Sequence, residues 1–323
     1  MAQVEKWLGQ VFSATGLADS VVKTVEARIG KIKGACMEIV QIVNDWRSQA
    51  VGGMVTALVL WEACVIPSFI HGAGTWMEIS TQTERQLNNI QYWFLRLVLQ
   101  VGQGAPKPSL LWDFGILDMK LRIWIEKAML LLHIRRLDED SLARKVYLDQ
   151  VSNKWPGLVQ EVEQICLELD IQSPAISKQS HKVYRNNLVS ACHEKNKEML
   201  ISECEGKTKC ERMLNEDYGR KEYVDMELIG NVRDTYKARF GMLDFADNYK
   251  NDRRFAGVGG LCKCKRDRES EPHLLSGQCE VFGEIRASYG DLKDDESLAK
   301  FFKEVLNKRD KIDEEAKKRV GTD

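Results

Sequence analysis

Four side chains that commonly bind metal ions stand close together near the C-terminal end of the sequence: Cys262, Cys264, His273 and Cys279. Thiolates and imidazoles are the usual ligands of tetrahedral Zn²⁺, and four of them close a structural site completely. The polar segment 265–272 has too few apolar residues for a core of its own, so a metal ion would supply the folding energy. We therefore predict a structural zinc site. The alternative is four unrelated loop residues, because the gap between the first two cysteines is shorter than usual.

The segment around these residues is basic. Residues 239–268 contain eight Lys or Arg against four Asp. Aromatic residues are interleaved with them, namely Phe240, Phe245, Tyr249 and Phe255. Basic groups pair with phosphates, and aromatic rings stack on unpaired bases. This pattern predicts nucleic-acid binding, whereas the alternative is that the aromatic residues form the core of a small domain.

No other set of side chains offers equally complete chemistry. Cys204 and Cys210 flank a short loop downstream of Cys192 and His193, but reduced thiols explain them better than a second metal site. The acidic runs 138–140 and 294–296 stand beside expected helix starts, where carboxylates act as caps. The sequence has neither a nucleophile elbow nor a phosphate-binding loop of the usual spacing. We therefore expect no complete catalytic site.

The elements that would position these groups are predominantly helical. The chain has 323 residues, 44% hydrophobic and 29% charged, with a formal net charge of −1, which excludes a disordered chain and a uniformly basic coat. Apolar residues repeat at helical spacing over about 19–45, 50–66, 117–135 and 158–169. Pro67 is expected to end the second helix, and a capping box of Thr81 and Glu84 to open another. Because Glu62 interrupts the apolar run 54–70, we expect a buried helix there and no membrane span. The predicted fold class is mainly α.

Four segments, taken in order, resemble the C-terminal part of a non-LTR (LINE-type) retrotransposon reverse transcriptase. Residues 6–9 (Lys-Trp-Leu-Gly) are similar to the family's Lys-Tyr-Leu-Gly motif at the end of the palm, and residues 66–76 to its thumb signature. The helix containing Leu87, Phe94 and Gly102 is similar to the next thumb helix, and the C-terminal cysteines and histidine to the terminal CCHC knuckle. The sequence departs from the family pattern at His71 (usually Tyr), at Gly74 (usually Glu) and in the last knuckle spacing, which is five where four is common.

The resemblance, together with the alternating charges of residues 181–240, which are typical of solvated helices and predict a connector, divides the chain into five parts. These are a palm remnant (1–18), a helical thumb-like domain (19–150), a helical connector of solvated helices (151–238), a basic zinc-knuckle module (239–290) and a charged helical tail (291–323). The family's catalytic aspartates would precede Met1, so the chain looks like a truncated copy that should not polymerise DNA alone. We expect no enzymatic activity from the chain on its own.

The resemblance also implies function and partners. In the family, the thumb grips the primer–template duplex and the knuckle helps to bind RNA, so we expect RNA or an RNA–DNA hybrid as the partner, in the cytoplasm or nucleus. Basic residues on the expected thumb helices include Arg28, Lys31, Lys33 and Arg85. The residues expected to contact nucleic acid are Lys6, Arg96, Arg253, Arg254, Lys263, Lys265 and Arg266. The alternative function is a helical protein-interaction scaffold with a structural zinc site and no nucleic-acid role.

Overall fold

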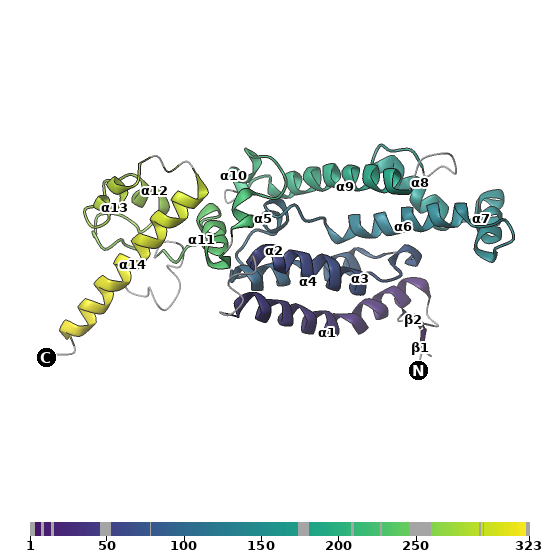
Figure 1. Cartoon of the computed structure of the whole chain (residues 1–323), viewed down its shortest axis with the longest axis horizontal. Coiled ribbons are helices and arrows are strands. Elements are labelled where there is room, and N and C mark those ends of the chain that lie inside the picture. Colours follow the sequence, from purple (N-terminus) through teal and green to yellow (C-terminus); the bar gives the residue numbers. More distant parts are fainter. Residues whose placement is uncertain are drawn as a thin grey trace.

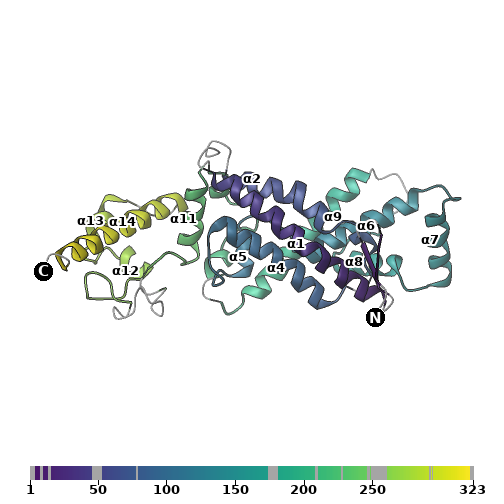
Figure 2. The ribbon, with the colours of Figure 1, turned by 90° about the horizontal axis from the view of Figure 1, so that it is seen from below.

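The computed structural model shows an elongated, mainly helical molecule with a separate C-terminal module at one end of its long axis (Figures 1 and 2). The mainly α fold class predicted from the sequence is therefore confirmed. The structure describes residues 4–7, 10–13, 16–45, 53–77, 79–173, 181–207, 210–226, 228–245, 248, 260–290, 292 and 294–320.

Most of the helices run along the long axis of the body, and the C-terminal module contains the long helix α14 with the short helices α12 and α13 beside it (Figure 1). The N-terminal part contains the hairpin β1 (Val4–Trp7) and β2 (Gln10–Ser13), α1 (Leu17–Asn44), α2 (Gly53–Leu60), the π-helical turn η2 (Trp61–Val65), α3 (Ile66–Phe69), the 3₁₀ turn η3 (Ala73–Thr75) and α4 (Thr81–Leu99). The middle contains α5 (Lys107–Trp112), α6 (Met119–Arg136), α7 (Leu142–Asn153), α8 (Leu158–Glu168) and α9 (His181–Cys204). The remainder contains α10 (Glu211–Leu214), η5 (Glu222–Asp225), α11 (Ile229–Arg239), α12 (Glu271–Leu275), α13 (Gly283–Ser288) and α14 (Asp295–Val320).

Buried apolar side chains form three clusters. The first lies among α1, α2, α4 and α5 and is completed by residues from 200–242. The second joins α6 to α8 and α9. The third lies in the C-terminal module, where Phe282 and the α14 residues Phe301 and Phe302 are fully buried. The change from the first cluster to the third falls within residues 238–243, beside the predicted boundary at 238/239.

The segment 181–240 is not the solvated connector that its charge pattern predicted. Helix α9 buries every fourth residue along one stripe, including Tyr184, Leu188 and Leu200. Further along, Tyr223 and Tyr236 lie fully or almost fully buried in the first cluster. Because the buried stripe of α9 is only one residue wide, most of its residues are polar, and hydrophobic periodicity alone underestimates its burial.

The apolar run 54–70 is helical, as predicted, and it continues through Pro67, but only one face of it is buried: Trp61 and Phe69 are fully buried, whereas Val59 is 56% exposed. The π-helical turn η2 immediately precedes α3, and Pro67 takes the second position of α3, so the helical segment passes the proline directly after a π-helical turn. No helix in the described ranges has the length and apolar content needed to cross a bilayer. The next long helix, α4, is capped by Ser80, whose hydroxyl accepts a hydrogen bond from the Thr83 N–H. The cap therefore lies one residue before the predicted Thr81.

Candidate metal centre

The four predicted metal ligands converge in the C-terminal module. One ligand atom from each of Cys262, Cys264, His273 and Cys279 lies within 4.8 Å of the other three. The Cys262 and Cys279 sulfur atoms are 3.6 Å apart, and Cys264 Sγ lies 3.4 Å from His273 Nε2. With Zn–S bonds of about 2.3 Å, a tetrahedral shell places two sulfur atoms about 3.8 Å apart. This arrangement fits a metal ion bound by all four residues.

A tight turn allows the short spacing between Cys262 and Cys264. The Cys262 N–H donates to the Asp267 carbonyl, and the Lys265 N–H donates to the Cys262 carbonyl, both at 2.8 Å. Lys265 adopts a left-handed conformation with φ of 60°, which turns the chain back within a few residues. The isolated bridge between Leu261 and Arg268 closes the loop. Cys262 and Cys264 are therefore presented to the same point although a single residue separates them.

The other two ligands lie in and beside two short helices. His273 lies in α12, next to the buried Leu274, and Cys279 lies between α12 and α13, where its carbonyl accepts a hydrogen bond from the N–H of Gly283 at the start of α13. Asp267 Oδ2 lies 3.6 Å from His273 Nδ1, on the ring edge that does not face Cys264. A carboxylate on that side fixes the orientation of a ligating imidazole and raises its basicity. The hydrophobic packing of α12 and α13 thus determines where the second pair of ligands lies.

The two thiols of the tight turn differ in their electrostatic surroundings. Burial raises the pKa of Cys262 above its ordinary value. Burial also acts on Cys264, but the backbone N–H groups of Arg266 and Asp267 outweigh it and lower the pKa of Cys264 to about 7. Backbone donors therefore stabilise one thiolate of the cluster before any ion is considered.

Three of the predicted nucleic-acid residues surround this centre. Lys263 pairs with Asp313 of α14, and Arg266 pairs with Glu280 on the exposed surface. Lys265 is exposed and has no ion-pair partner among the described residues. The basic surface beside the centre is thus partly neutralised by acidic residues of the same chain, which reduces the number of cations free to meet phosphate.

The remaining predicted contacts are not gathered at the centre. Arg253 and Arg254 lie outside the described residues, and Lys6 lies in β1, where the backbone alone is described. Arg96 is half-buried on α4 in the helical body, and its guanidinium donates to the Ala105 carbonyl at 3.0 Å. Arg28, also expected on the thumb surface, is buried and donates to the carbonyls of Phe69 and His71. Its role in the structure is to satisfy the C-terminal end of α3.

The aromatic residues of the basic segment are part of the core where they are described. Phe240 is 2% exposed and Phe245 is fully buried, and they belong to the first and third clusters respectively. These two rings are therefore not available to stack on bases, so the alternative that they form a core is the correct one. Tyr249 and Phe255 lie outside the described residues.

The second thiol group does not form a metal site in the part of the chain that the structure describes. The cluster at Cys262 is the one set of three or more metal-binding side chains found there. Cys204 and Cys210 are both buried free thiols, and burial is the main reason that the pKa of Cys204 is raised. Burial likewise raises the pKa of Cys192 to about 12. Cys192 and Cys204 therefore stay protonated at neutral pH, and all three thiols lie in the core.

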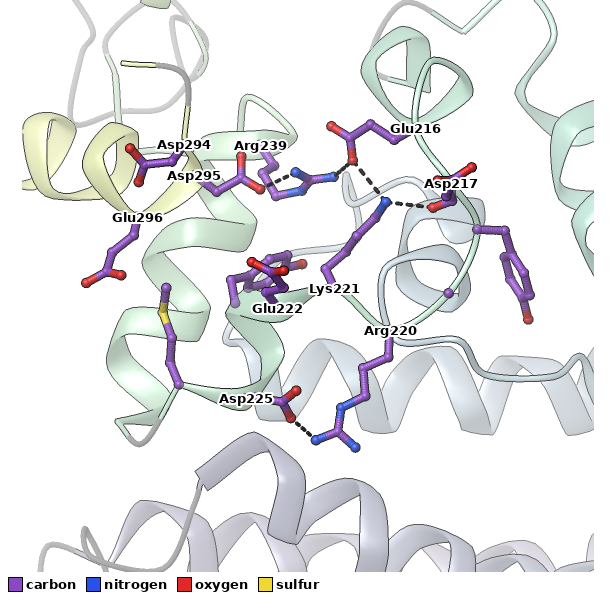
Figure 3. Close-up of a pocket in the computed structure, with 14 residues that line it drawn as sticks. Glu216, Asp217, Arg220, Lys221, Glu222, Asp225, Arg239, Asp294, Asp295 and Glu296 are labelled. Atoms are coloured by element: carbon purple, nitrogen blue, oxygen red, sulfur yellow. Dashed lines mark hydrogen bonds and ion pairs between the residues drawn. The ribbon is translucent and has the colours of Figure 1, made fainter. Parts of the chain in front are cut away.

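Sequence reasoning missed an ionic network centred on Arg239, which it had counted as part of the basic surface. The Arg239 side chain is 2% exposed and pairs with Asp113 at 2.8 Å, with Glu216 at 2.5 Å and with Asp295. Figure 3 shows Arg239 between Glu216 and Asp295, and Lys221 beside Glu216. The clue in the sequence was the position of Arg239 at the end of an amphipathic helix, but its three acidic partners are distant in the chain.

This network lies at the base of an acidic cleft of about 900 Å³ between the body and the C-terminal module. Burial raises the pKa of Asp113, with Arg239 opposing it, and Tyr223 donates a hydrogen bond to the same carboxylate at 2.8 Å. For Glu216, burial is outweighed by Arg239 and Lys221, which together lower its pKa to about 2. The network joins α5, the segment before η5, α11 and α14, and so fixes the module to the body.

No family model, curated protein or solved structure matches this chain.

Proposed function

We propose that this chain is a nucleic-acid-binding part of a LINE-type reverse transcriptase, comprising a thumb-like bundle and a zinc knuckle that binds single-stranded RNA. The observation that carries the proposal is the convergence of four ligand atoms within 4.8 Å beside an exposed lysine, Lys265. The order of the four motifs along the sequence is the second support.

Zn²⁺ is the metal ion that we propose for the knuckle. Three thiolates and one imidazole form a soft tetrahedral ligand set, which suits Zn²⁺ better than the oxygen-preferring Mg²⁺ or Ca²⁺. All four positions are filled by protein, as in structural sites, so no position is left for a reactive water. The ion would hold the turn at Cys262 against α12 and α13 and so keep Lys265 and Arg266 on one exposed surface.

RNA binding at this surface would be mainly electrostatic. With Phe240 and Phe245 buried, base stacking contributes less than the sequence suggested, and phosphate contacts dominate. If six basic residues of the segment 239–268 meet phosphates, the logarithm of the binding constant should fall with the logarithm of salt concentration with a slope of about −4, from about −0.7 per contact.

The test uses the full chain and a fluorescently labelled 20-nucleotide single-stranded RNA, with an RNA–DNA hybrid as a second ligand. Charge reversal at four predicted contacts should weaken RNA binding at least tenfold and reduce the salt slope, with the zinc content unchanged: Arg253→Glu, Arg254→Glu, Lys263→Glu and Lys265→Glu. The matched control reverses four exposed lysines elsewhere: Lys145→Glu, Lys154→Glu, Lys182→Glu and Lys207→Glu. A slope near zero, or equal weakening in both variants, would contradict specific binding at the knuckle.

A second function, a helical scaffold for protein partners, is favoured by a different observation. The pairs Lys263–Asp313 and Arg266–Glu280 neutralise two of the predicted RNA contacts within the chain. If the chain is such a scaffold, the variant with four reversed charges should keep its zinc site and should capture protein partners from nuclease-treated extract as well as the native chain does. Loss of RNA binding with an intact fold would instead support the knuckle proposal.

A further inference from the structure

A cleft in the helical body, distant in sequence from the metal centre, has the features of a small-molecule site. It has a volume of about 620 Å³ and lies between the η2–α3 segment and α9, with α6 as its floor. Ligand sites of this kind are concave and mainly apolar, with a few fixed polar groups. Ile66, Ile125 and Val189 supply the apolar walls, and they come from three different helices.

Helix α9 presents three residues to the cleft at successive turns: Arg185, Val189 and His193. Four-residue spacing keeps them on one face, and eight residues separate Arg185 from His193 by about 12 Å along the helix axis. An apolar side chain therefore lies between two hydrogen-bond donors. Arg185 is exposed, and it has no ion-pair partner among the described residues, so its full charge is left for a ligand.

A buried relay fixes the protonation of His193. Asn196 is fully buried; its Oδ1 accepts from the Asp118 N–H, and its Nδ2 donates to the Ile116 carbonyl and to the Tyr218 hydroxyl oxygen. The Tyr218 oxygen thus already accepts a hydrogen bond, and its own proton is left for His193 Nδ1 at 3.1 Å. His193 is then the tautomer that carries its proton on Nε2.

The charge states of the Tyr218 and His193 rings agree with a hydrogen bond from the Tyr218 hydroxyl to His193 Nδ1. Burial raises the pKa of Tyr218 to about 12, so that the phenol keeps its proton. Burial, followed by the nearby Arg122, lowers the pKa of His193, so that the imidazole is neutral at pH 7. The Nε2–H of His193 has no partner among the described residues, which leaves it as a donor for a ligand.

The other strong charges of the cleft satisfy each other. Arg122 holds the Glu62 carboxylate with two hydrogen bonds, at 2.7 and 2.5 Å, and donates a third to the Leu117 carbonyl. Such a bidentate pair is geometrically well defined. Glu62 therefore offers little attraction to a cationic ligand, and the unpaired cation of the cleft in the described structure is Arg185. Glu126, the remaining acidic residue of the lining, is exposed to solvent.

We propose that this cleft binds a small amphipathic anion, with its charged head at Arg185 and its apolar body along Val189. A carbonyl or other hydrogen-bond acceptor at the far end would meet the Nε2–H of His193. None of the residues of this cleft belongs to the knuckle, so its test does not depend on RNA binding there.

The test measures binding of 8-anilinonaphthalene-1-sulfonate, an apolar two-ring anion that fluoresces in apolar sites. The native chain should bind one molecule saturably. Arg185→Gln and Val189→Asp should each weaken binding at least fivefold, and His193→Phe about threefold. Arg85→Gln, at an exposed arginine on α4 outside the cleft, should leave it unchanged. Circular dichroism checks the fold of each variant, and Arg185→Glu provides a second test at the exposed position.

Competition against the bound dye tests the charged head and the apolar body of the ligand separately. Decanoate should displace the dye at least tenfold more effectively than 1-decanol or inorganic phosphate, because the site requires both head and body. Equal displacement by decanol would overturn the role of Arg185, and equal displacement by phosphate would overturn the role of the apolar wall. Binding that is unchanged in both Arg185→Gln and Val189→Asp would overturn the site itself.

Discussion

At the level of single residues, the ligand set at Cys262, Cys264, His273 and Cys279 has the clearest chemistry in the molecule. Its four ligand atoms meet within 4.8 Å although the sequence spacing is shorter than usual at one end and longer at the other. The left-handed turn at Lys265 accounts for the single-residue gap between Cys262 and Cys264. The separate helices α12 and α13 account for the five-residue gap between His273 and Cys279. Spacing rules describe loops of ordinary geometry, and a special backbone conformation changes the distance that a given number of residues spans.

We expect the purified chain to contain one zinc ion per molecule, and Cys279→Ser to reduce this to well below one. Removal of a ligand opens the shell, and metal binding supplies on the order of 10–16 kcal/mol in small zinc peptides. The module should therefore lose its cooperative unfolding transition. Elemental analysis measures the zinc content, and denaturant unfolding measures the loss of the transition. Cys64→Ser, at an exposed thiol, is the control and should keep its zinc; full zinc content in Cys279→Ser would refute the site.

The Glu216 carboxylate should make stability depend on pH in acid. Its pKa in the folded chain is about 2, against an ordinary value of 4.5, so its stabilisation is complete above pH 4.5 and is lost as the pH falls towards 2. The full effect is on the order of 3 kcal/mol. Asp113 acts in the opposite direction, because burial raises its pKa.

Thermal unfolding between pH 5 and pH 2.5 measures the effect of Glu216. Glu216→Gln should flatten the pH dependence of the melting temperature relative to the native chain. Glu222→Gln, at an exposed position of the same cleft, should reproduce the native slope. Parallel curves for the native chain and Glu216→Gln would show that Arg239 does not stabilise this carboxylate.

At the level of elements, η3 packs closely against α6 at Gly74, a position where the family that the sequence resembles usually has glutamate. A Cβ atom on Gly74 would lie 3.0 Å from the Glu126 carbonyl oxygen and 3.1 Å from the Leu130 Cβ. The family's usual glutamate at this position could not fit against α6 without moving one of the two elements. The departure at Gly74 is thus accompanied by a helix packing that requires a small residue.

We expect Gly74→Ala to destabilise the chain by about 1–3 kcal/mol, because an extra carbon atom overpacks the contact with α6. The matched variant, Gly34→Ala in the middle of α1, has nothing within 4 Å of the new Cβ. It should stabilise the chain by about 0.5–1 kcal/mol, the difference in helix propensity. Denaturant unfolding compares both with the native chain; equal effects of the two substitutions would contradict the close packing.

At the level of the whole molecule, one buried arginine joins two bodies that have separate cores. Arg239 ends α11 and pairs with Asp113 of the body and with Asp295 at the start of α14. The hydrophobic cluster of the module also reaches Ala238 in the same helix. The end of α11 is therefore the structural junction between the module that carries the metal centre and the rest of the chain.

We expect Arg239→Met to destabilise the junction by about 3–5 kcal/mol, since it leaves the fully buried Asp113 without its cation. Urea unfolding should then separate into two transitions, with the module released before the body. Arg220→Met removes an exposed ion pair with Asp225 and should cost at most about 1 kcal/mol. A single transition at the native midpoint in Arg239→Met would show that the apolar contacts alone hold the module.

The amino-acid sequence alone determined the helical class, most of the long helices and the identity of the four side chains that converge near the C-terminal end. These properties are local, since they depend on periodicity, capping and the types of neighbouring residues. Three features depended on the tertiary structure. Helix α9 is buried along one stripe, the helix continues through Pro67, and Arg239 is buried at the junction with the module instead of lying on the surface. They arise from partners that lie tens to more than a hundred residues away, such as Asp113 for Arg239. Charge and polarity read along the chain do not indicate which side chains long-range packing will bury together.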